Sequence, residues 1–99
     1  MLTRLFNALQ AVETDLRFHW RKRIRPLTLA LALDTVAAAV SSLLADPKEG
    51  IMLAKCAVTF LTTSARCAED YGDYAFAETV RGMIRTYRPA LEACEGSYT

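Results

Sequence analysis

The stretch Asp46-Pro47-Lys48-Glu49, near the middle of the chain, has the composition of a helix N-terminus. An aspartate at the cap can accept a hydrogen bond from a free backbone amide, and a proline fits the first helical position. The glutamate three residues after the cap completes a capping box. We therefore expect one helix to end before this stretch and another to begin within it.

Two further boundaries and a helical period divide the rest of the chain. Pro26 pushes the residue before it out of the α region, while Gly72-Asp73 combines a helix stop with an N-cap. Between these boundaries, apolar residues recur at three- and four-residue steps. Pro89 interrupts the last segment, but the apolar spacing continues beyond it, so we expect a kink there. The expected helices cover about residues 2–25, 27–45, 47–70 and 73–94, with a frayed tail over 95–99.

The connections between these helices are short, which favours antiparallel neighbours. The chain has 99 residues, of which 53% are hydrophobic, enough to build a core in one small domain. The sequence therefore predicts an all-α protein, a small up-down four-helix bundle with short connections over residues 1–99. Two helical hairpins that open around a partner would produce the same pattern.

Groups that could carry catalysis are scarce, and few loop residues remain in which an active site could be built. His19 is the only histidine, and a lone histidine without a paired cysteine, carboxylate or serine is a poor activator of a nucleophile and cannot complete a metal site alone. No phosphate-binding glycine loop, zinc motif or serine elbow occurs. We expect a protein that is not an enzyme, with no catalytic residue, no cofactor, no metal site and no small-molecule substrate.

The cysteines indicate a reducing compartment. Cys56, Cys67 and Cys94 are odd in number and widely spaced, which argues against a disulfide framework. The N-terminus begins an amphipathic helix and lacks the features of a signal peptide. We expect a cytoplasmic protein.

The apolar content exceeds that of an average soluble domain, and such a surplus is typical of proteins that bind a partner. The long apolar stripe of the first helix could pair with a second copy or with an amphipathic helix of another protein. We expect a non-catalytic interaction module, such as an adaptor, chaperone or regulator, although the same side chains could fill the protein's own core. The expected partner-binding residues are Leu5, Phe6, Leu9, Val12, Leu16 and Trp20.

Positive charge gathers at the end of the first helix, although the net charge of the chain is only +1. No acidic residue occurs between Asp15 and Asp34. Basic residues beside Phe18, His19 and Trp20 could steer an acidic protein partner, or could bind nucleic acid or an anionic surface. They would also complement the dipole of a helix C-terminus. The expected basic surface consists of Arg17, Arg21, Lys22, Arg23 and Arg25.

Residues 27–45 support a third alternative, a small membrane-embedded accessory subunit. This stretch is about long enough to span a bilayer, and the basic residues before it would remain on the cytoplasmic side. Each central leucine favours insertion by about 0.5 kcal/mol, whereas a central aspartate such as Asp34 opposes it by about 3 kcal/mol. These contributions nearly cancel, so the membrane role stays an alternative.

Overall fold

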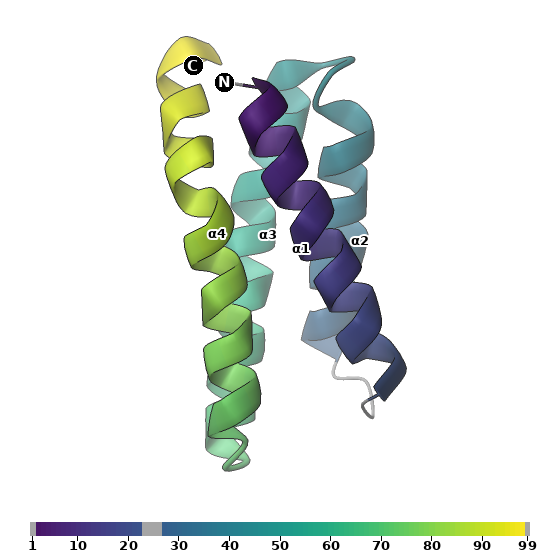
Figure 1. The fold of residues 1–99 in the computed structure, drawn as a ribbon, viewed down its shortest axis with the longest axis vertical. Helices are drawn as coiled ribbons and strands as arrows, with labels where there is room; N and C mark the ends of the chain where they lie inside the picture. The colour runs from purple at the N-terminus through teal and green to yellow at the C-terminus, as the bar shows by residue number, and fades with distance from the viewer. Residues whose placement is uncertain (1, 23–26, 99) are drawn as a thin grey trace.

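The computed structural model describes residues 2–22 and 27–98, and these residues form a bundle of four α-helices (Figure 1). Each helix packs against the next along the chain, and α1 also packs against α4, which closes the ring. Successive helices run in opposite directions, so both termini lie at one end of the bundle. The expected up-down four-helix bundle is confirmed. The helices are α1 (Leu2–Lys22), α2 (Leu27–Ser42), α3 (Pro47–Asp70) and α4 (Tyr74–Tyr98).

The turn between α2 and α3 has the predicted N-cap and proline, but the amide of Asp46 donates to the Ser42 carbonyl and not to the Glu49 side chain, so the capping box is not completed. Asp46 Oδ1 accepts a hydrogen bond from the amide of Glu49 at 3.4 Å, and Pro47 occupies the first helical position. α2 ends at Ser42, earlier than expected, because the amides of Ala45 and Asp46 both donate to the Ser42 carbonyl, at 3.1 and 2.7 Å. These bonds form a compact turn that reverses the chain.

The turn between α3 and α4 is a Schellman motif. Gly72 has a φ of 80°, in the left-handed region that favours glycine. The amide of Gly72 donates to the carbonyl of Glu69 at 2.9 Å, and the amide of Asp73 donates to that of Ala68 at 2.8 Å. Asp73 Oδ1 then accepts from the amide of Phe76 at 3.2 Å. The predicted stop and cap are both confirmed.

The end of α4 differs from the expectation. The helix passes through Pro89, as expected, but it continues to Tyr98, so the expected end near residue 94 was wrong. Proline has no amide hydrogen and removes one helical bond, to the Arg85 carbonyl. Beyond it, Ala90, Leu91 and Cys94 are buried in the core, and this packing holds the last turns in place.

The core draws on all four helices, but α3 packs differently against its two neighbours. Toward α2, a Cβ atom placed on Gly50 would lie 2.5 Å from Leu43 Cα, so only glycine permits this backbone approach. Toward α4, the fully buried ring of Tyr87 reaches α3, and its hydroxyl donates to the Ala54 carbonyl at 3.3 Å. Burial raises the pKa of Tyr87 well above its ordinary value.

Candidate functional site

The apolar stripe of α1 lies inside the bundle. Leu5, Leu9, Val12 and Leu16 are at most 1% exposed, and Phe6 is partly buried against the same core. α2 and α4 pack against α1 from its two sides and close this stripe off from a partner. The stripe is therefore core in this structure, and a docking surface has to be sought elsewhere. Trp20 belongs to α1, but its side chain lies outside the described part of the chain.

The basic segment is only partly within the described residues. Arg17 is exposed, and its Nε lies 3.5 Å from Glu13 Oε1, one helical turn earlier. Arg21 and Lys22 end α1, but their side chains fall outside the described part of the chain, as do Arg23 and Arg25 entirely.

His19 has a packing role in this structure. Its ring centroid lies 5.4 Å from that of Phe18 and 5.5 Å from that of the buried Phe76 on α4. The histidine thus joins α1 to α4 through aromatic contacts. Among the described residues, no three histidine, cysteine or acidic side chains gather in a way that could hold a metal ion.

Exposed apolar side chains gather at the end of the bundle opposite the termini. At this end, the last turn of α1 and the first turn of α2 lie on one side, and the end of α3 and the first turn of α4 lie on the other (Figure 1). Leu27 is 75% exposed and Tyr71 is 90% exposed. We call this region the apolar end; its residues are Phe18, Leu27, Leu31, Tyr71 and Tyr74.

Two shallow grooves follow the boundary between α3 and α4. One groove, of about 220 Å³, is lined by positively and negatively charged side chains as well as by the apolar Val58 and Leu91. In it, Lys55 Nζ lies 3.8 Å from Glu95 Oε1. The other, of about 240 Å³, has no carboxylate among its lining residues. We call it the arginine groove; it is lined by Thr62, Arg81, Ile84, Arg85 and Arg88.

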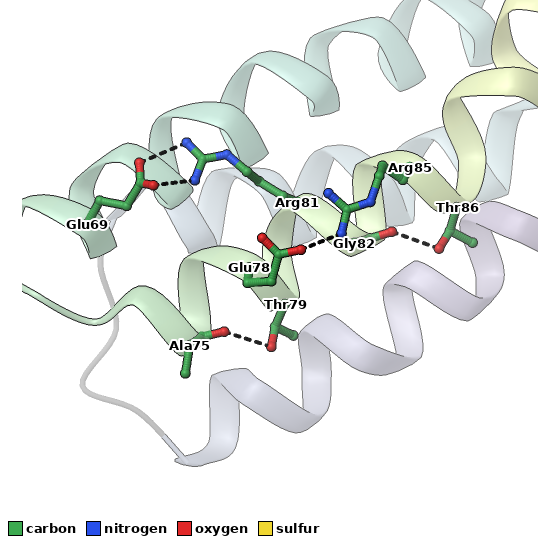
Figure 2. A network of polar contacts seen from close by, with 8 residues as sticks. All are labelled: Glu69, Ala75, Glu78, Thr79, Arg81, Gly82, Arg85 and Thr86. Atoms are coloured by element: carbon green, nitrogen blue, oxygen red, sulfur yellow. Dashed lines mark hydrogen bonds and ion pairs between the residues drawn. The ribbon is translucent and has the colours of Figure 1, made fainter.

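Two of the three guanidinium groups of the arginine groove are paired at its edges (Figure 2). Arg81 donates two hydrogen bonds, of 2.6 and 2.8 Å, to the carboxylate of Glu69, and Arg85 donates one of 2.6 Å to Glu78. The hydrogen bond from Arg81 is the main cause that lowers the pKa of Glu69. Arg88 forms no ion pair with any carboxylate of the described residues.

Sequence reasoning missed both surfaces for identifiable reasons. Arg81, Arg85 and Arg88 are spaced four and three residues apart, so the sequence shows only that they share one face of a helix. Nothing in that spacing indicates which part of α3 forms the opposite wall of the groove. The apolar end combines residues from four separate segments, so no local pattern reveals it.

Of the described helices, α3 is the one that is long and apolar enough to cross a membrane, judged by length and composition, and a third of that apolar window is buried in the bundle. α2, the centre of the membrane alternative, has 16 residues. At 1.5 Å per residue it is about 24 Å long, shorter than the hydrocarbon core of a bilayer.

Comparison with known proteins identifies no relative: no family model, no curated protein and no solved structure matches the chain. We therefore infer the function from the chemistry of this chain's own surfaces.

Proposed function

We propose that this protein is a small non-catalytic interaction module that binds a second copy of itself through the apolar end. The observation that carries the proposal is the exposure of Leu27, Tyr71 and Tyr74 on the same end of the bundle as Phe18. Large apolar and aromatic side chains are enriched at the centres of protein interfaces, where they lose contact with water. Each copy would cover these side chains of the other.

Charge supports a second copy as the partner. The sequence around the α1–α2 connection is basic from Arg17 to Arg25, whereas Asp70 and Asp73 flank the α3–α4 turn at the same end of the bundle. A two-fold axis through this end would bring the α1–α2 half of one copy opposite the α3–α4 half of the other. Opposite charges in this arrangement favour the correct orientation.

The area of the apolar end determines how stable a dimer we expect. The bundle measures 39 × 20 × 17 Å, so its end presents a cross-section of only 20 × 17 Å. This is smaller than the about 800 Å² that each partner contributes to a typical stable interface. We therefore expect a weak dimer that dissociates on dilution.

Light scattering coupled to size-exclusion chromatography, over a wide concentration range and without detergent, tests the proposal. The apparent mass should rise from monomer to dimer with concentration, and added salt should weaken the dimer. Leu27→Ser should shift the transition to higher concentration. Leu44→Ser is the matched control, because Leu44 is similarly exposed but lies in the turn at the opposite end.

Three results would overturn the proposal. A protein that is monomeric at every concentration would show that it does not self-associate. Equal effects of Leu27→Ser and Leu44→Ser would show that the dimer contact lies outside the apolar end. A protein that stays dispersed only in detergent would favour the membrane role considered for residues 27–45.

A further inference from the structure

α2 differs from the other three helices because it has almost no charge on any side. Asp34 is the only charged residue of this helix, whereas α1, α3 and α4 each carry several charged residues on their exposed sides. A surface helix normally turns a charged or polar face toward water. The outer side of α2 therefore has the composition of a contact surface. The buried side, which faces the core, consists of Leu29, Ala32, Leu33, Val36 and Ala39.

The outer residues of α2 follow the spacing of a contact between two helices. From Leu27, the first residue of α2, steps of four, three, four and three residues lead along one stripe. Alternating steps of three and four keep side chains on the line along which a second helix packs. Three of the four residues beyond Leu27 are exposed, and Ala38 is half-buried. We call these four residues the outer stripe: Leu31, Asp34, Ala38 and Ser41.

Small side chains in and beside the outer stripe permit a close approach. Ala38 and Ser41 extend little beyond the backbone, and the same is true of Ala30 and Ala37 next to the stripe. The distance between two packed helices depends on the side chains at their contact and is shortest where these are small. A second helix with larger apolar side chains, such as leucine, would fill the space above these residues.

Asp34 determines which charge the second helix must carry. Its side chain is exposed, and it forms no ion pair with a described residue. The residues one helical turn before and after it, Ala30, Leu31, Ala37 and Ala38, are uncharged. Covering a carboxylate that has no partner costs free energy, so a helix that covers the stripe has to supply a positive charge.

The same aspartate disfavours two other occupants. Asp34 lies at the middle of α2, so a two-fold contact centred on this helix would bring Asp34 of each copy together, and like charges repel. In the hydrocarbon of a membrane, a central aspartate costs about 3 kcal/mol. We propose that the outer stripe binds an amphipathic helix of another protein, one whose apolar contact side carries a single lysine or arginine that pairs with Asp34. This surface is distinct from self-association at the apolar end, although Leu31 borders both.

The test is an NMR titration of the full chain, labelled with ¹⁵N, using two synthetic helical peptides of three heptads each. Both peptides have leucine at the a and d positions, except that the central d position is lysine in one and glutamate in the other. We expect the lysine peptide to shift the amide signals of the outer stripe. It should bind about fivefold or more tightly than the glutamate peptide, because only lysine can pair with Asp34.

Asp34→Lys should reverse this preference, so that the glutamate peptide becomes the tighter ligand. Asp15→Lys is the matched control, because it makes the same change of charge at an exposed position on α1 and should keep the preference for the lysine peptide. Both substitutions are at exposed sites, and circular dichroism checks that both variants remain folded. Equal effects of the two substitutions would show attraction to net charge alone and would overturn the inference.

Three further results would overturn it. The amide signals of the outer stripe could stay unchanged at the highest peptide concentration, or the shifts could be confined to the apolar end. Binding to phosphatidylcholine vesicles, with no binding to either peptide, would instead assign the outer side of α2 to a membrane surface.

The light-scattering measurement on the same variants separates this inference from the proposed function. Asp34 lies one turn beyond Leu31, outside the apolar end, so Asp34→Lys should retain the concentration-dependent dimer while its peptide preference reverses. If the lysine peptide fails to bind but the dimer forms, the outer-stripe proposal is wrong and self-association stands. If the protein stays monomeric but binds the lysine peptide at the outer stripe, self-association is wrong and this inference stands.

Discussion

α3 packs in two different ways on its two sides. Toward α2, the backbones meet so closely at Gly50 and Leu43 that a single added carbon would lie 2.5 Å from Leu43 Cα. Toward α4, the large ring of Tyr87 fills the space and adds a hydrogen bond to Ala54. α3 is therefore sensitive to added atoms on the side that faces α2, and to removed atoms on the side that faces α4.

Removing the Tyr87 ring should have the largest effect. Tyr87→Ala leaves a cavity between α3 and α4, and we expect the free energy of unfolding to fall by about 3–5 kcal/mol. Urea denaturation monitored by circular dichroism measures this change. Tyr87→Phe keeps the ring and removes only the hydroxyl, so it should cost about 1 kcal/mol. Equal losses in the two variants would mean that the hydrogen bond, rather than the ring, holds this side.

Adding a methyl group on the α2 side should have the next largest effect. Gly50→Ala forces the two backbones apart, and we expect a loss of about 1–3 kcal/mol, as for other overpacked sites. Gly82→Ala is the control, because the nearest atom to its added Cβ is a flexible guanidinium nitrogen 3.9 Å away. There, alanine should stabilise the helix by about 0.5–1 kcal/mol. The comparison fails if Gly50→Ala also stabilises the protein.

High pH should weaken the α4 side specifically. Burial raises the pKa of Tyr87, so the folded protein keeps this group neutral after the unfolded chain begins to ionise, near pH 10. Stability from this group is complete below about pH 10 and falls by about 1.4 kcal/mol per pH unit above it. Unfolding free energies measured from pH 8 to 11 should decline less steeply in Tyr87→Phe; parallel declines would rule out Tyr87 as the cause.

The smallest effect should come from Ser64, which lies two heptads after Gly50 on α3. Its side chain is 2% exposed, and its hydroxyl has no hydrogen-bond partner among the described residues. A buried hydroxyl without a partner costs free energy, so Ser64→Ala should stabilise the protein by about 1 kcal/mol. Thermal unfolding measures this stabilisation, with Ser41→Ala, at an exposed site, as the control. A lower melting temperature for Ser64→Ala would mean that the hydroxyl does bond in solution.

Local chemistry explains how much of this fold could be predicted. Asp46, Pro47 and Gly72 act on the backbone within a few residues, so their turns follow from the sequence directly. The periodic stripe of α1 shows which side chains avoid water, but it does not show whether the covering surface belongs to this chain or to a partner. That question decided the role of Leu9, and only the packing of α2 and α4 answered it.

The contact at Gly50 and the arginine groove were beyond prediction for a related reason. The groove depends on the relative height of two helices, and the Gly50 contact depends on how the α2–α3 turn folds Leu43 onto α3; a period of 3.6 residues encodes neither. A glycine within a helix can also stand where there is room for a side chain, as at Gly82. The expected end of α4 near residue 94 rests on the general tendency of chain ends to fray, whereas α4 continues to Tyr98, beyond the buried Cys94.

The position of the two termini determines how the bundle would respond to a pulling force. The chain begins and ends at the same end of the bundle, on α1 and α4, which are antiparallel neighbours (Figure 1). Tension applied through the termini therefore peels α1 from α4 from one end, and it loads their contacts one after another instead of all at once. The protein should yield mechanically at low force, through unzipping rather than shearing, even where its resistance to chemical denaturation is high.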